Sequence, residues 1–276
     1  MKSTKKIISI NKLHAFENHP YKVQDNEEME ALSESIKEHG IVSPVIVRPL
    51  ENTTDEYEII SGHRRVMASR KAGITEVPAL IVPLDRDGAA IVLVDSNLHR
   101  EHILPSEKAF AYKLKADALN HKGQACGQVG HKSRDGVSET ESGRQVQRYI
   151  RLTYLIPELL ELVDEKRIAF TPAVELSYLN ELEQADLYEE ICICDATPNL
   201  SQAQRLRAIS REEGLTPEHI GEILAEEKAN QREKIKIPAE RIRRFFPKSY
   251  TTEQIEEAIV KLCESRYRAR QGRDSR

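Results

Sequence analysis

Patterns that favour β-strands are confined to about the first 100 residues of this chain and almost vanish after Pro105. A capping box of Asp25 and Glu28, followed by apolar residues at helical spacing, predicts a helix that ends at Gly40. Short apolar runs bounded by turn residues predict strands at residues 7–10, 45–48, 57–60 and 77–82. This mixture predicts an α+β domain over residues 1–103.

The remainder of the chain predicts helices. Pro105 suits a first helical position, in a helix through about Leu119, and Thr216-Pro217 marks the start of a later one that runs to about Ala229. Residues 121–132, rich in Gly, Gln and His, predict a loop. Further helices are expected at 142–152, at 157–166, from 172, after a capping box of Ser201 and Gln204, and after one of Thr251 and Gln254. We predict an all-α domain over residues 104–229 and a linker with a small helical segment over residues 230–276.

The run Ser61–Arg65 joins a predicted strand to a predicted helix through Gly62. A helix start exposes unpaired backbone N–H groups, and the helix dipole there favours an anion. Arg64 and Arg65 add planar cations suited to phosphate oxygens. The pattern therefore favours a phosphate site, although a surface helix start with two solvated arginines has the same spacing.

The segment 142–152 is a second candidate site. Ser142 and Gln145 form a capping box, and Val146, Tyr149 and Ile150 face inward at helical spacing. Arginine and glutamine are the side chains that read guanine and adenine edges in the major groove. The segment contains no acidic residue, which favours DNA contact over an ordinary solvated helix. The polar residues expected to face outward are Arg144, Gln145, Gln147, Arg148 and Arg151.

Charge is segregated along the chain, although the formal net charge is only -4. Residues 235–276 carry 11 Lys/Arg against 6 Asp/Glu, and residues 153–234 carry 8 against 18, as expected where one face meets an anionic partner. The narrow apolar face of the last predicted helix favours a homodimer, with intramolecular packing as the alternative.

The cysteines and the apolar runs bear on the compartment. The four cysteines fit no zinc spacing and predict reduced thiols, with Cys192 and Cys263 packed between helices. No apolar run approaches the ~18 residues that cross a bilayer, so a cytoplasmic protein is expected.

Four segments in this order resemble the ParB family, which includes RepB-like proteins, of chromosome and plasmid partition. Gly40–Pro49 is similar to the family's first nucleotide motif. Gly62–Arg65 sits where the family has Gly-Glu-Arg-Arg, and Ser96–Glu101 sits where it has Glu-Asn-Leu-Gln-Arg-Glu. A helix-turn-helix at about residues 133–152 follows some forty residues later. For Ala89–Val94, periodicity leaves strand and helix open, and the resemblance favours helix.

The resemblance implies a CTP-gated mechanism. The N-terminal domain would bind CTP with magnesium, two such domains of a homodimer would close a clamp on double-stranded DNA, and a ParA-type ATPase would engage the clamp. Loading would occur at a parS-like site, so the protein would associate with the nucleoid or a plasmid. The implied nucleotide contacts are Ser43, Arg48, Gly62, His63, Arg64, Arg65, Asn97 and Arg100, with Asn97 also at the magnesium. The implied DNA contacts are Ser142, Arg144, Gln145, Gln147, Arg148 and Arg151.

Three residues depart from the family pattern. His63 and Ser96 stand where the family has acidic residues that would position a metal or activate water. We therefore hypothesise nucleotide binding with slow or absent hydrolysis, at most a weak CTPase. The first helix of the predicted helix-turn-helix carries Gly136, which costs about 1 kcal/mol against alanine in a helix interior, and is a little short for the family.

Two other function classes remain as alternatives. One is a sequence-specific helix-turn-helix transcription regulator with a vestigial nucleotide pocket. The other is an enzyme, because the N-terminal fold resembles that of sulfiredoxin and of a phosphotransferase for free amino acids. Sulfiredoxin needs a cysteine beside its phosphate motif, whereas the first cysteine here is Cys126, and the helix-turn-helix argues against the phosphotransferase.

Overall fold

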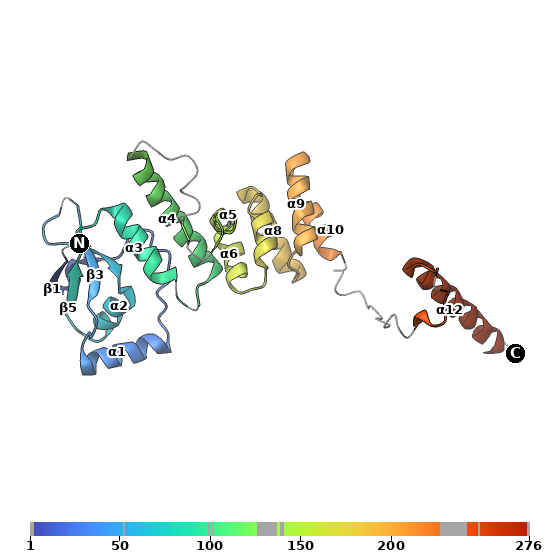
Figure 1. Ribbon diagram of the computed structural model, residues 1–276, viewed down its shortest axis with the longest axis horizontal. Helices are drawn as coiled ribbons and strands as arrows, with labels where there is room; N and C mark the ends of the chain where they lie inside the picture. Colours follow the sequence, from blue (N-terminus) through green and yellow to red (C-terminus); the bar gives the residue numbers. More distant parts are fainter. Residues whose placement is uncertain are drawn as a thin grey trace. The chain divides into compact units, whose positions relative to one another are not determined.

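The computed structural model describes residues 3–51, 53–98, 100, 102–125, 137–138, 141–226, 242–247 and 249–274 (Figure 1). Contacts divide the chain into two units, Met1–Glu226 and Glu227–Arg276. The expected boundaries at residues 103/104 and 229/230 stay predictions. In the first unit the helices are α1 (Glu27–His39), α2 (His63–Lys71), α3 (Arg86–Leu98), α4 (Pro105–Ala125), α5 (Gly143–Leu152), α6 (Pro157–Asp164), α7 (Phe170–Leu176), α8 (Glu181–Cys194), α9 (Leu200–Glu212) and α10 (Pro217–Ala225).

The N-terminal part is built on a five-stranded mixed sheet with the order β1-β5-β3-β4-β2. The pairs β1–β5 and β3–β4 are antiparallel, whereas β3–β5 and β2–β4 are parallel. All four predicted strands are confirmed, and β2 is too short to show alternation in the sequence. The elements are β1 (Thr4–Ser9), the 3-10 helix η1 (Ile10–Lys12), β2 (Leu13–His14), β3 (Val45–Pro49), β4 (Tyr57–Ser61) and β5 (Glu76–Ile81).

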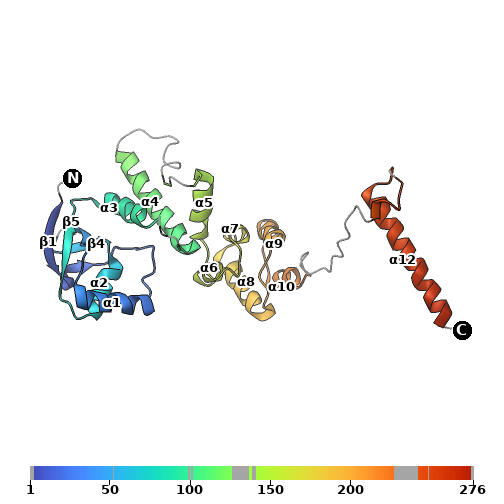
Figure 2. The same cartoon turned by 60° about the horizontal axis from the view of Figure 1, so that its bottom comes forward.

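Alternation along the strands gives the sheet two buried faces. Val47 and Ile59 pack in one cluster with Val66 of α2. Ile60, the next residue of β4, packs in another cluster with Leu93 of α3. Helix α1 packs on α2, and the two lie side by side in Figures 1 and 2. The residues on either side of the turn between β4 and α2 are thus fixed by the clusters on the two faces of the sheet.

Two helix caps differ from the predicted ones. The N-cap of α1 is Asn26, whose side chain accepts from the Met29 N–H, while the neighbouring Asp25 pairs with Lys71. Asp25, which the local sequence favoured as the cap, thus forms a tertiary ion pair instead. Helix α9 is capped reciprocally by Asn199 and Gln202, two residues before the predicted box of Ser201 and Gln204. Both helices form as expected, and only their starts shift.

Helix α3 spans Ala89–Val94, so helix is confirmed for the segment that periodicity left open. Helix α4 continues to Ala125, so the loop predicted from residue 121 is wrong over 121–125, and residues 126–132 lie outside the described residues. The predicted capping box of Thr251 and Gln254 is confirmed by reciprocal contacts of 2.9 and 3.3 Å.

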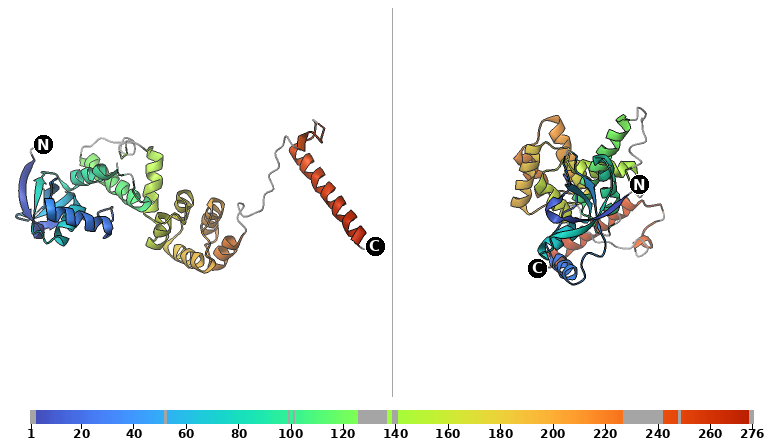
Figure 3. Two further views of the ribbon diagram at one scale, coloured as in Figure 1. Left: turned by 90° about the horizontal axis from the view of Figure 1, so that it is seen from below. Right: turned by 90° about the vertical axis from the view of Figure 1, so that its left-hand side faces the viewer.

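Helices α4 to α10 share a hydrophobic core of their own, separate from the clusters on the sheet. Leu152, Leu159, Leu176, Leu187 and Leu206 contribute one buried side chain each from α5, α6, α7, α8 and α9. Figure 3 shows these helices as a succession of short segments after α4. Short helices of this kind bury one apolar stripe each, so their stability comes from mutual packing rather than from length.

The described part of the second unit is dominated by α12 (Thr252–Asp274). Cys263 on this helix and Cys192 on α8 are both exposed, so the prediction that they pack between helices is wrong. Cys126 and Gly136 lie outside the described residues. Within the described ranges, no helix combines the length and the apolar character that a bilayer crossing requires.

Candidate functional site

The turn between β4 and α2 is built around Gly62. Its φ of 108° lies in the left-handed region, and a Cβ atom there would lie 2.8 Å from Val45 Cγ1. Only glycine therefore fits without displacing β3. Helix α2 begins at His63, and the first N–H groups of a helix, together with its dipole, attract anions. The predicted strand-glycine-helix arrangement is confirmed.

A cavity of about 120 Å³ lies at this helix start. Four cationic side chains line it, Lys22, Arg64, Arg65 and Arg100, and none of its described lining residues is a carboxylate. The cavity is therefore suited to an anion. Its full lining is His19, Tyr21, Lys22, Val23, Ser61, Gly62, His63, Arg64, Arg65, Asn97 and Arg100. Six of the eight predicted nucleotide residues are in this lining, the exceptions being Ser43 and Arg48.

The two arginines of α2 are held differently. The Arg65 guanidinium donates through Nη1 to the carbonyls of Ser43 and Pro44, the second at 2.9 Å. Arg64 Nη2 lies 2.9 Å from Glu28 Oε2 in an ion pair whose glutamate side chain is 72% exposed. Exposed pairs of this kind exchange readily with water. Arg65 is therefore pre-positioned, and Ser43, which is exposed, meets the site through its backbone.

Asn97 and Arg100 bring the end of α3 to the same cavity. Asn97 is buried, and its Nδ2 donates to the Leu93 carbonyl at 2.7 Å. Arg100 is exposed and lies over the Tyr21 ring, with Cζ 5.7 Å from the ring centroid. Asn97 and Arg100 of the segment 96–101 thus meet the segment Gly62–Arg65 at one cavity, although the two segments are far apart in the sequence.

Two histidines pack against each other in the cavity wall. The ring centroids of His19 and His63 lie 3.9 Å apart. The Phe16 N–H donates to His63 Nε2 at 3.4 Å, which assigns the ring proton of His63 to Nδ1. Burial, with smaller contributions from His19 and Arg100, lowers the pKa of His63 to about 3. Burial also lowers the pKa of His19, whose Nδ1 donates to the Tyr21 carbonyl at 2.7 Å.

Acidification is expected to destabilise this part of the protein. The His63 pKa is about 3 in the folded chain against an ordinary 6.5, so the unfolded state binds more protons between these values. Stability is full above the ordinary pKa and falls as the pH drops, by on the order of 1–2 kcal/mol from pH 7 to pH 5. Chemical denaturation at both pH values checks this, with His63→Gln expected to lose less than the native chain. Equal losses would contradict the assignment.

We call residues 16–22 the pocket strap. The backbone N–H of Lys22 donates to Glu107 Oε1 of α4 at 2.9 Å, and its Nζ lies 3.8 Å from Asp164 Oδ2 of α6. The strap therefore ties the cavity to the helical region. Sequence reasoning missed it, because its turn residues, Asn18 and Pro20, do not show where the loop packs. It contributes three lining residues, His19, Tyr21 and Lys22.

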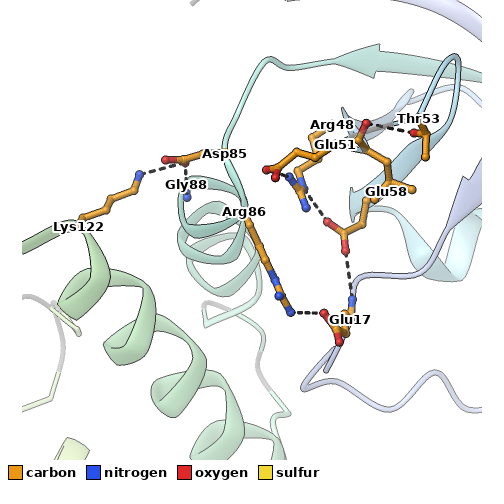
Figure 4. A network of polar contacts seen from close by, with 10 residues as sticks. Glu17, Arg48, Glu51, Thr53, Glu58, Asp85, Arg86, Gly88 and Lys122 are labelled. Carbon is orange, nitrogen blue, oxygen red and sulfur yellow. Dashed lines mark hydrogen bonds and ion pairs between the residues drawn. The ribbon is translucent and has the colours of Figure 1, made fainter. Parts of the chain in front are cut away.

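Arg48 lies away from the cavity, in a buried ion pair. Its Nε is 2.6 Å from Glu58 Oε2, and the two side chains are 5% and 6% exposed. The other oxygen, Glu58 Oε1, accepts from the Glu17 N–H of the pocket strap at 3.2 Å. Arg86 of α3 pairs with the Glu17 carboxylate, completing the network in Figure 4. The structure thus places Arg48 where it supports the strap, and the nucleotide contact that the resemblance implies for Arg48 stays a prediction.

Helix α5 has the predicted N-cap, with Ser142 Oγ accepting from the Gln145 N–H at 3.3 Å. The Gln145 side chain does not complete the predicted capping box, because its Oε1 accepts from Arg148 Nη1 at 3.2 Å. Val146 and Leu152 are buried, while Arg144 and Gln147 are exposed. Residues 133–136 and 139–140, in the first helix and turn of the predicted helix-turn-helix, lie outside the described residues. The helix-turn-helix therefore stays a prediction.

Two arginines of α5 are engaged within the molecule instead of facing solvent freely. Arg148 Nη2 donates to Thr171 Oγ1 at 2.9 Å. Arg151 Nη2 donates to the Ser177 carbonyl at 2.7 Å, and its guanidinium lies 4.0 Å from the centroid of the Tyr178 ring. Cation–π stacking and hydrogen bonds of this kind fix the helix on α7 and on the turn that follows it. The expectation that all five polar residues face outward is wrong for these two, because contacts with later helices are not visible in helical spacing.

Comparison with known proteins identifies the N-terminal part. Residues 1–98 match the sequence model of the ParB N-terminal domain. Residues 1–98 therefore form a ParB N-terminal domain, and the chain is ParB-like in this part. Probable chromosome-partitioning protein ParB of Neisseria meningitidis is 32% identical over 166 residues, which cover 60% of this chain and 54% of that protein. Nucleoid occlusion protein of Listeria innocua is 30% identical over 185 residues, covering 67% of this chain and 61% of that protein.

The matched part of this ParB-like chain spans little more than half of these relatives. Among solved structures, the truncated ParB of Caulobacter crescentus complexed with CTP-gamma-S is 24% identical, with 68% of this chain and 99% of that chain covered and a TM-score of 0.33. The same protein complexed to the centromeric parS site is 20% identical, with 74% and 98% covered and a TM-score of 0.41.

Proposed function

We propose that this ParB-like protein binds a nucleoside triphosphate, CTP by family resemblance, in the cavity at the start of α2. The observation that carries the proposal is the convergence of Arg64, Arg65 and Arg100 on a glycine-started helix N-terminus. Backbone N–H groups and arginine forks are the donors that phosphate oxygens require. The arginines bind and orient the phosphates, and the walls of the cavity restrict the water around them.

The DNA-binding element of the proposal is α5. Arg144 and Gln147 are exposed on a helix whose other arginines are held by packing, so they are free to contact base edges. By resemblance, the protein would load at a parS-like site as a homodimer, close as a clamp, slide, and engage a ParA-type ATPase in chromosome or plasmid partition. It would then act in the cytoplasm, at the nucleoid or a plasmid.

Hydrolysis of the nucleotide is expected to be slow or absent. His63 is neutral and carries no carboxylate, and the hydroxyl of Ser96 donates to the Leu93 carbonyl of its own helix at 3.0 Å. Neither side chain has the acidic group that would serve as a strong base for water. CTP turnover stimulated by cognate DNA would contradict this expectation.

The nucleotide proposal is tested by titrating the purified protein with CTP, ATP, GTP and UTP. Selective binding of CTP at micromolar concentration is expected. No binding to any nucleotide would favour a sequence-specific transcription regulator whose pocket is vestigial. The specific observation that keeps this alternative is the pair of departures at His63 and Ser96.

The DNA assignment makes a paired prediction. Arg144→Ala should weaken specific DNA binding by ~1–3 kcal/mol without changing the free energy of unfolding, because Arg144 is exposed. Arg151→Ala should lower the free energy of unfolding, because it removes the contacts with Ser177 and Tyr178. Fluorescence anisotropy with cognate and scrambled duplexes, alongside denaturation, separates the two. Unchanged discrimination in Arg144→Ala would move base reading elsewhere.

A further inference from the structure

The donor set of the cavity does not fit a magnesium ion. Magnesium at nucleotide sites is usually held by one or two carboxylates together with substrate phosphates. The described lining offers only neutral side-chain oxygens, from Asn97, Ser61 and Tyr21. The magnesium that the family resemblance implies therefore has no anionic ligand among these residues.

Two carboxylates among the described residues, on α1 and α4, have other partners. Glu28 pairs with Arg64 on the exposed side of the site. Glu107 accepts from the backbone N–H groups of Lys22 and Leu104, at 2.9 and 3.2 Å. Neither is in the described lining. Turning Glu107 toward a metal would break its contacts with the backbone of Lys22 and Leu104, which position the cavity wall.

Cationic side chains take the place that a metal would have in offsetting phosphate charge. Lys22, Arg64, Arg65 and Arg100 all line the cavity, and Arg65 is fixed by two backbone carbonyls before any ligand arrives. A fixed guanidinium stabilises an anion without the cost of reorganisation.

His63 adds a directed donor to this set. Its Nε2 accepts from the Phe16 N–H, so its remaining polar group is the Nδ1–H. The stacked His19 donates its own Nδ1–H to the Tyr21 carbonyl, so this N–H is not available to a ligand in the cavity. Where the family has a glutamate, an anionic ligand would meet like charge, and a bridging cation would be needed. The histidine removes that need.

We propose that this cavity binds a nucleoside triphosphate without a divalent cation, and that the His63 Nδ1–H donates to a phosphoryl oxygen. The proposal rests on the nucleotide-binding function proposed above and concerns how the same site holds its ligand. It makes His63 a binding residue whose chemistry is opposite to that of the glutamate it replaces.

The experiment is a titration of the full chain with CTP, followed by calorimetry, in EDTA and in millimolar magnesium. The native chain should bind with affinities within about threefold of each other in the two buffers. His63→Glu should bind at least roughly tenfold more weakly in EDTA and recover in magnesium, because the new carboxylate repels the phosphates unless a cation bridges them. His63→Asn, which keeps an amide N–H near the Nδ1 position, should behave as the native chain.

The matched control is His39→Glu, the same charge change on the exposed end of α1, which should leave both affinities unchanged. Binding by the native chain only in magnesium would overturn this inference and leave the nucleotide proposal standing. Absence of binding in both buffers would overturn the two together. Because the native chain alone decides the first comparison, misfolding of a variant cannot remove the test.

Discussion

Arg48→Ala is expected to lower the free energy of unfolding by roughly 3–5 kcal/mol, since it leaves a carboxylate buried without its partner. The Arg48–Glu58 pair is 2.6 Å long and both side chains are nearly inaccessible to solvent. Glu58 also holds the backbone of Glu17 in the pocket strap, so the loss should reach the cavity. Chemical denaturation measures the stability, and a CTP titration on the folded variant measures the effect on the site.

A double variant separates the charge from the contact. Arg48→Met combined with Glu58→Gln removes both charges, and the glutamine keeps an oxygen for the Glu17 N–H. We expect it to recover much of the lost stability, because replacing a buried ion pair by uncharged groups is often neutral. Lys6→Ala is the comparison on the surface, where losing the exposed pair with Asp55 should change the free energy of unfolding little. An Arg48→Ala effect no larger than that of Lys6→Ala would refute the buried-charge argument.

Arg65→Ala is expected to weaken nucleotide binding by roughly 10- to 100-fold, which corresponds to hydrogen bonds with a charged group worth about 1.5–3 kcal/mol. Arg65 lines the cavity and is positioned by the carbonyls of Ser43 and Pro44. Its removal also frees the loop before β3. Calorimetry with CTP, after a check that the variant unfolds cooperatively, measures the loss.

Arg64→Ala is the matched control for this prediction. Arg64 shares the helix turn, the charge and the cavity, but its guanidinium is exposed and paired with Glu28. Its loss should therefore weaken binding by less than the loss of Arg65. Equal effects would show that net charge, rather than pre-positioning, governs the site. No effect of either substitution would favour the transcription-regulator alternative.

Local patterns in the sequence were enough to predict most helices and strands and the turn between β4 and α2. The strand-like run Tyr57–Ile60 and the glycine after it predicted both the strand and the start of the helix that follows. The geometry at Gly62 leaves no room for a side chain, so the pattern and the structure agree for a steric reason. The cap of α1 failed because Asp25 forms a tertiary ion pair that no local rule contains.

Contacts between residues far apart in the sequence could not be predicted from the sequence. Arg48 and Glu58 are direct partners across β3 and β4, but a strand register is not visible in either strand alone. The family resemblance predicted that Arg48 contacts the nucleotide, whereas the structure shows its guanidinium paired with Glu58, which also holds the strap. Arg151 illustrates the same point for α5, because its helical position is outward while Tyr178 and Ser177 approach from later in the chain.

The anchoring of the pocket strap bears on how this protein can be dissected. The ParB N-terminal match ends at residue 98, yet Lys22 is held by Glu107 and lies near Asp164. A chain shortened after residue 103 would keep the sheet, Gly62 and both arginines of α2, but would lose these anchors. Such a fragment should show faster amide hydrogen exchange in residues 16–22 than the full chain does. The smallest piece that keeps both anchors of the pocket strap therefore extends through α6, well past the end of the matched domain.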